Sequence, residues 1–152
     1  MIKDLKSIDD IANYLRKRGE ILKPVKLKAI KSIEEKYNIL LPDTYKKFLS
    51  LMGNGAGNFM KGSSAFYDEI LNLKEWTNEL IIDNDLEILP DNAFVFWMHQ
   101  GYQAAYFKVF ENEDPPVYFF SEGVNYPDGF RLTENSLTSF FLEQLSFSYS
   151  DI

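Results

Sequence analysis

The chain has 152 residues, 45% of them apolar, which suffices for one domain, residues 1–152, that buries about 70% of the surface exposed in the unfolded chain. Because the chain contains no cysteine, disulfide scaffolds, thiolate zinc sites, iron–sulfur clusters and cysteine nucleophiles are excluded. The net charge of −7 is unevenly spread: residues 1–52 carry +5 and residues 53–152 carry −12, which disfavours nucleic acid and favours a basic partner. The N-terminus does not resemble a signal peptide, and no segment reaches the roughly 20 apolar residues of a membrane helix, so we expect a cytoplasmic protein that binds no membrane.

The first third of the sequence predicts three helices, at residues 7–18, 26–37 and 42–52. The first begins at Ser7, a preferred N-cap residue, and ends at Gly19, with Asp10 completing a variant of the capping box. The second ends at Asn38, which tolerates a left-handed backbone, and the third begins at Pro42, whose missing N–H would be unpaired there. We expect these apolar faces to be buried: Ile8, Ile11, Ala12 and Leu15; Leu27, Ile30 and Ile33; and Tyr45, Phe48, Leu49 and Met52.

The rest of the sequence is richer in strand patterns. The expected elements are a short strand at 65–71, a polar helix at 74–82, a hairpin at 94–107, a strand at 115–120, a turn at 125–129 and a helix at 136–147. Helices therefore precede the strands and one helix follows them. This order predicts an α+β fold, with the N-terminal helices and a C-terminal helix packed on a central, mainly antiparallel twisted sheet.

The predicted hairpin contains the only histidine of the chain, His99, and its turn is expected at Gln100-Gly101. A two-residue turn there defines six opposing pairs: His99 with Tyr102, Met98 with Gln103, Trp97 with Ala104, Phe96 with Ala105, Val95 with Tyr106 and Phe94 with Phe107. Large side chains then lie opposite alanines, so we expect both faces of the hairpin to be covered. Only the tip is polar, which makes His99 and Tyr102 candidates for contact with a protein partner.

No catalytic, cofactor or metal site is predicted. One histidine without a cysteine leaves few ways to activate a nucleophile, and no serine lies in a GxSxG motif. The acids Asp83, Asp85 and Glu87 resemble the first half of a calcium loop, but Ile88 stands where that loop requires glycine. An enzyme acting through carboxylates alone is the one enzymatic alternative.

The segment IEEKYNILLPDTYKKFL, residues 33–49, resembles the start of the SUKH superfamily of Smi/Knr-like proteins. The similarity extends over residues 25–146, although Asn38 stands where the family usually has glycine. The residues that match the family pattern are Ile33, Glu34, Tyr37, Leu41, Pro42, Tyr45, Phe48, Leu49, Asn54, Gly55, Leu89, Pro90, Gly101, Pro116, Val117, Tyr118, Ser136, Leu137, Phe140 and Phe141.

The resemblance implies a non-enzymatic α+β module that binds proteins. Bacterial members look like immunity proteins that neutralise polymorphic toxins, often nucleases, by direct binding, and fungal relatives regulate cell-wall assembly. We therefore expect an immunity protein, a monomer or weak homodimer, whose partner is a toxin domain with a basic surface. A regulatory scaffold in cell-wall or envelope synthesis is the alternative. The expected partner-binding residues are Asp68, Glu69, Asp83, Asp85, Glu87, His99 and Tyr102.

Overall fold

The computed structural model describes residues 2–86, 88–110, 112–122 and 130–149, and its centre is one five-stranded antiparallel sheet. The strands are β1 (Ser63–Ser64), β2 (Ala93–His99), β3 (Gln103–Lys108), β4 (Val117–Ser121) and β5 (Arg131–Glu134). Each strand pairs with the next one along the chain, so the sheet is a simple meander. The predicted α+β class is confirmed, whereas the turn expected at 125–129 lies outside the described residues.

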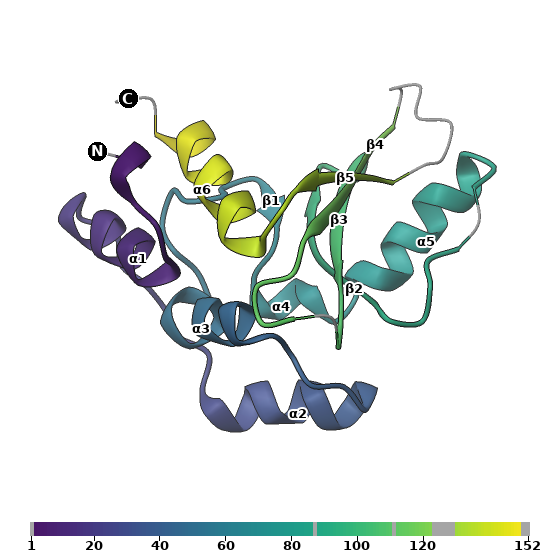
Figure 1. Ribbon diagram of the computed structural model, residues 1–152, viewed down its shortest axis with the longest axis horizontal. Coiled ribbons are helices and arrows are strands. Elements are labelled where there is room, and N and C mark those ends of the chain that lie inside the picture. Colours follow the sequence, from purple (N-terminus) through teal and green to yellow (C-terminus); the bar gives the residue numbers. More distant parts are fainter. Residues whose placement is uncertain (1, 87, 111, 123–129, 150–152) are drawn as a thin grey trace.

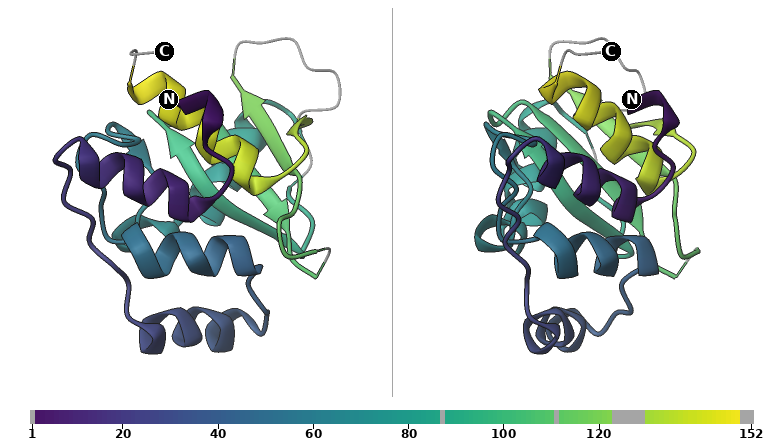
Figure 2. Two further views of the ribbon diagram at one scale, coloured as in Figure 1. Left: turned by 60° about the vertical axis from the view of Figure 1, so that its left-hand side comes forward. Right: turned by 90° about the vertical axis from the view of Figure 1, so that its left-hand side faces the viewer.

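Helices cover both faces of the sheet (Figure 1). The helices are η1 (Ile2–Asp4), α1 (Ile8–Lys17), α2 (Leu27–Tyr37), α3 (Asp43–Met52), α4 (Tyr67–Ile70), α5 (Leu73–Asp83) and α6 (Leu137–Ser148). One face carries α5, and the other carries α6 and α3, with α1 packed against both of these helices. Figure 2 shows α2 beyond α3, at the edge of the molecule. None of the described helices has both the length and the apolar character needed to cross a bilayer.

The helix ends follow the local sequence signals. The backbone N–H of Asp10 donates to Ser7 Oγ at 3.1 Å, so the Ser7 N-cap is confirmed, and Asp10 Oδ2 accepts from the N–H of Lys6, the residue before the cap, at 2.8 Å. Asn38 ends α2 with φ of 52°, in the left-handed region. Leu27 was expected in the core but is 64% exposed. Helix α2 packs on α3 through Ile30 and Ile33, and Leu27 lies in the first turn of α2, beyond this contact.

The strand predicted at 65–71 is wrong. The strand β1 is limited to residues 63–64, and the short helix α4 begins at Tyr67, whose N–H donates to the carbonyl of Gly53 at 2.7 Å. Ile70 and Leu73 are buried at a spacing of three residues, whereas Asp68 and Glu69, which precede Ile70, are exposed. That spacing suits a helical turn and not the alternation of a strand.

The β2–β3 hairpin has the predicted turn but a different register near its tip. Gln100 and Gly101 both have positive φ, at 52° and 77°, and the N–H of Tyr102 donates to the carbonyl of His99 at 3.2 Å. Tyr102 is nevertheless an extra residue, because the observed pairs are His99 with Gln103, Met98 with Ala104 and Trp97 with Ala105.

A bulge in β2 at Phe96 compensates for this extra residue. The pairs Val95 with Tyr106 and Phe94 with Phe107 are therefore as predicted. Phe96 and Trp97 are adjacent in sequence, yet both contact Phe140 of α6, at ring-centroid distances of 5.0 and 5.5 Å. The bulge thus turns two consecutive aromatic rings towards the same helix.

Aromatic side chains fill the space between the sheet and α3. Phe48 stacks on Phe141 at 4.5 Å, and Tyr45 contacts Phe94 and Phe107 at 5.4 and 5.2 Å. Tyr45 is fully buried, its hydroxyl has no hydrogen-bond partner among the described residues, and burial raises the pKa of that hydroxyl well above its usual range. Helix α6, which contributes Phe141, begins after Ser136, whose Oγ accepts from the N–H of Ser139 at 3.1 Å.

Candidate functional site

An acidic groove lies between α5 and the tip of the β2–β3 hairpin. Its volume is about 400 Å³, and its walls include Trp76, Glu79, Asp83, Met98 and Glu122. Its lining residues include three carboxylates and no basic side chain. The groove therefore has the negative charge that the composition of residues 53–152 predicted for a partner surface.

Helix α5 supplies most of the groove. Glu75, Glu79 and Asp83 are spaced by four residues, so their carboxylates follow one another along the helix surface. Like charges at this spacing destabilise a helix, and Asp83 lies in the last turn, where the helix already carries a partial negative charge. This last turn contains no basic residue. Glu75 lies in the first turn, where a carboxylate stabilises the helix, so it is Asp83 that is unfavourable for α5 itself, which favours a role for Asp83 in binding.

Glu122 completes the groove from the end of β4. Its backbone N–H donates to the carbonyl of Tyr102 at 2.8 Å, which fixes β4 to the hairpin tip. One carboxylate oxygen, Oε2, accepts from Nδ2 of Asn84 at 2.8 Å, and the same nitrogen donates to the carbonyl of Leu80 at 2.9 Å. The C-terminal end of α5 thus holds this carboxylate in place beside Asp83.

Trp76 adds an aromatic surface to the three carboxylates. Its side chain is 39% exposed, whereas Leu80 and Met98 next to it in the groove are buried. A tryptophan beside carboxylates suits an arginine or lysine side chain, because the ring attracts the cation and the carboxylates neutralise it. Partly exposed tryptophan is also enriched among residues that dominate binding energy at protein interfaces.

The structure places only part of the predicted partner-binding set at this groove. Asp83 lines it, and Glu69 borders it, because Glu69 Oε2 accepts from the hydroxyl of Ser64, another lining residue, at 2.9 Å. Asp68 is exposed on α4, and Asp85 follows α5 with φ of 61°. Glu87 lies outside the described residues.

His99 and Tyr102 are separate from the acidic groove. The His99 ring stacks on Trp97 with an angle of 8° between the rings, and its Nδ1 lies 3.0 Å from Ser63 Oγ. The ring of Tyr102 is 37% exposed and contacts His99 edge-on at 6.2 Å. Both rings therefore belong with Trp97, which contacts α6, and not with the acids of α5.

Glu79 and Glu122 are groove residues that the sequence analysis missed. The spacing of four residues between Glu75, Glu79 and Asp83 was a usable signal for Glu79. No local pattern indicates Glu122, since only the pairing of β4 with β3 brings it to the hairpin tip.

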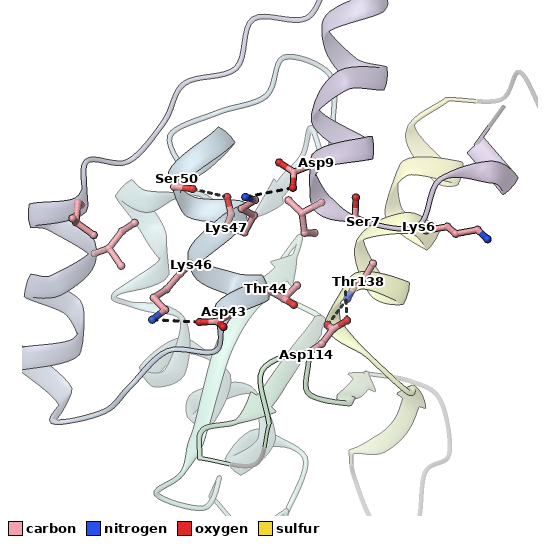
Figure 3. Close-up of a pocket in the computed structure, with 13 residues that line it drawn as sticks. Lys6, Ser7, Asp9, Asp43, Thr44, Lys46, Lys47, Ser50, Asp114 and Thr138 are labelled. Carbon is pink, nitrogen blue, oxygen red and sulfur yellow. Dashed lines mark hydrogen bonds and ion pairs between the residues drawn. The ribbon is translucent and has the colours of Figure 1, made fainter.

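A second cleft, of about 710 Å³, lies between α1, α3 and the start of α6 (Figure 3). Its charges are balanced within the protein: Lys46 pairs with Asp43 at 3.6 Å and Lys47 with Asp9 at 3.4 Å. Asp114 accepts from the backbone N–H and the hydroxyl of Thr138, at 2.9 and 2.8 Å, and so caps α6. Its described lining contains three lysines and three aspartates, so this cleft favours neither a basic nor an acidic partner.

Within residues 2–86, 88–110, 112–122 and 130–149, no three histidine or acidic side chains are arranged to hold a metal ion. Partial burial, together with the nearby carboxylate of Glu143, raises the pKa of Glu134. Neither of these two glutamates lines the acidic groove.

A comparison with protein-family models matches residues 24–143 to the SMI1 / KNR4 family (SUKH-1). A search of curated proteins found no match to the chain. The matched segment begins three residues before α2, ends within α6, and includes every strand of the sheet and all of α5. It also contains Trp76, Glu79, Asp83 and Glu122 of the acidic groove. The fold and this match together show that the chain belongs to the SMI1 / KNR4 family (SUKH-1).

Proposed function

We propose that the protein is a non-enzymatic immunity protein of the cytoplasm, whose whole chain acts as one domain and binds a cognate toxin through the acidic groove. The observation that carries this proposal is the groove itself, where Glu79, Asp83 and Glu122 surround the partly exposed Trp76 without any basic side chain. Family membership is consistent with a protein-binding module of this type.

Binding would use charge in two ways. At long range, the −12 charge of residues 53–152 attracts a basic protein and raises the rate of encounter. At contact, a lysine or arginine of the toxin enters between Trp76 and the carboxylates, and a desolvated cation–aromatic contact contributes about 2 kcal/mol. If the toxin is a nuclease, the carboxylates occupy the places of substrate phosphates, and the bound protein covers the active site.

The test is co-expression with the toxin domain encoded beside the gene, combined with calorimetric titration of the two purified proteins. The double variant Glu79→Lys, Asp83→Lys reverses the charge of the groove. Because like charges opposed across an interface cost several kcal/mol, we expect it to bind at least about 100-fold more weakly and to lose protection.

Glu35→Lys is the control for charge, because Glu35 is exposed on α2 and its replacement should leave binding within about threefold of the unchanged protein. Full protection by the groove variant would exclude the acidic groove as the binding site. No protection by the unchanged protein would refute the immunity function and leave the regulatory scaffold as the better interpretation.

A further inference from the structure

An aromatic cleft of about 460 Å³ lies on the other face of the sheet from the acidic groove. It is lined by the C-terminal half of α6, by residues 60–63 and by strands β2 to β4. Its lining includes four aromatic rings, those of Trp97, His99, Phe119 and Phe147. This volume falls within the range of sites that bind small molecules, about 300–1,000 Å³.

The aromatic rings form an organised surface. The Trp97 ring is nearly parallel to that of His99 and lies 5.8 Å from the ring of Phe119. Phe147, on the last turn of α6, is 72% exposed. None of the described residues buries this ring, so it is available to a flat molecule that enters the cleft.

The polar groups of the cleft favour an anion. Lys61 is exposed and forms no ion pair with any described residue, and the lining contains no carboxylate. His99 Nδ1 lies next to Ser63 Oγ, so the other ring nitrogen, Nε2, does not contact this serine. Gln103 Nε2 donates one of its two hydrogens to Ser121 Oγ at 3.3 Å, and the second is not part of that bond.

The backbone around Lys61 is held in an unusual conformation. Met60 and Gly62 both have positive φ, at 54° and 89°, and such a conformation is unfavourable for methionine. The N–H of Met60 donates to the hydroxyl of Ser148 at 3.2 Å, which ties this turn to the end of α6. Strained residues of this kind are concentrated at ligand sites, where the surrounding structure maintains them.

We propose that the aromatic cleft binds a small planar aromatic anion. The aromatic body of the ligand packs against Phe119, His99 and Phe147, and its anionic group lies near Lys61. The site is independent of the acidic groove, because the two clefts share no lining residue and lie on opposite faces of the sheet.

The two tryptophans of the chain provide the readout. Each gives one indole N–H signal in a proton–nitrogen correlation spectrum, and Trp76→Phe assigns them. Trp97 lines the aromatic cleft, and its buried indole N–H has no hydrogen-bond partner among the described residues, whereas Trp76 lines the acidic groove and serves as the internal control. The probes are 2-naphthoate, its neutral analogue 2-naphthamide, and acetate.

We expect 2-naphthoate to shift the Trp97 signal saturably and to leave the Trp76 signal in place. It should bind about two- to fivefold more tightly than 2-naphthamide, since an exposed charge pair contributes about 0.5–1 kcal/mol, and acetate should have no effect. Equal affinity for 2-naphthoate and 2-naphthamide, no shift of Trp97 with either ring compound, or an equal shift of both indoles would overturn the proposal.

Two variants locate the ligand. Lys61→Gln should remove the preference for 2-naphthoate, and Phe147→Ala should weaken both ring compounds about two- to tenfold, as expected for one aromatic contact. Both side chains are exposed, so neither change disturbs the core. Lys28→Gln, on α2, is the matched control and should change nothing. A preference for 2-naphthoate that survives Lys61→Gln would exclude Lys61 as the anion contact and refute this binding mode.

Discussion

A hydrogen bond between residues 20 and 149 links the two ends of the chain and should make stability depend on pH. The Tyr149 hydroxyl donates to Glu20 Oε2, and the same oxygen accepts from the N–H of Asn58 at 2.8 Å. The Arg18 guanidinium lies 4.7 Å from the centre of the Tyr149 ring. These contacts, chiefly the Tyr149 hydrogen bond, lower the pKa of Glu20, whereas partial burial and the Glu20 carboxylate raise the pKa of Tyr149.

The sign and size of the effect follow from these contacts. Since the pKa of Glu20 is lower in the folded state, its contribution is present above the unfolded value, about 4.3, and is lost as the pH falls through the folded value. A hydrogen bond to a charged group contributes about 1.5–3 kcal/mol when buried. The Glu20 carboxylate is largely solvated, so screening reduces the expected cost of Tyr149→Phe to about 1 kcal/mol.

Thermal unfolding followed by circular dichroism measures this cost at about pH 7 and at about pH 3, above and below the unfolded-state pKa of glutamate. At pH 7, Tyr149→Phe should lower Tm by about 2–4 °C, because about 1 kcal/mol has that effect in a domain of this size. At pH 3 the loss should shrink to about a quarter, since a protonated carboxyl is the weaker acceptor.

Tyr37→Phe is the matched control. The Tyr37 hydroxyl donates to the backbone carbonyl of Leu71 at 3.2 Å, and a carbonyl does not titrate in this range. The effect of Tyr37→Phe on Tm should therefore be equal at both pH values. A Tyr149→Phe effect that is also independent of pH would refute the assignment of this stability to the charged form of Glu20.

Two further substitutions test the core and the acidic helix. Tyr45→Phe removes a buried hydroxyl that has no hydrogen-bond partner, so urea unfolding should show a gain of about 1 kcal/mol; a loss would indicate a hidden partner. Asp83→Asn removes a like charge from the C-terminal turn of α5 and should raise stability by about 0.3–1 kcal/mol at low salt, while it weakens toxin binding. A gain that persists undiminished in about 1 M salt would contradict this electrostatic origin.

Local signals were sufficient where a residue and its neighbours determine the conformation. Ser7, Asn38 and the Gln100-Gly101 turn behave as predicted, because a cap or a tight turn depends on a few adjacent residues. The strand expected at 65–71 was wrong. Over so short a segment, the apolar residues fit the spacing of a strand as well as that of a helix, and the hydrogen bond from the N–H of Tyr67 to the carbonyl of Gly53 selects the helix.

The candidate site was less predictable, because it depends on contacts between distant segments. Asp83 and Glu69 were named from the excess of acids, but this excess alone does not indicate which acids meet. Glu122 lies at the groove only because β3 pairs with β4. The His99 side chain lies on the opposite face of the sheet only because of the bulge in β2. Neither the pairing nor the bulge has a signal in the local sequence.

That bulge has a consequence for the two surfaces of the sheet. Side chains alternate between the two faces of a regular strand. If β2 had no bulge at Phe96, Trp97 and His99 would lie on the same face as Val95, and Met98 would lie on the same face as Phe94. The imidazole would then point towards the carboxylates of α5. One inserted residue therefore reverses which face each side chain in the outer half of β2 occupies, and it places His99 in the aromatic cleft, on the face opposite the acidic groove.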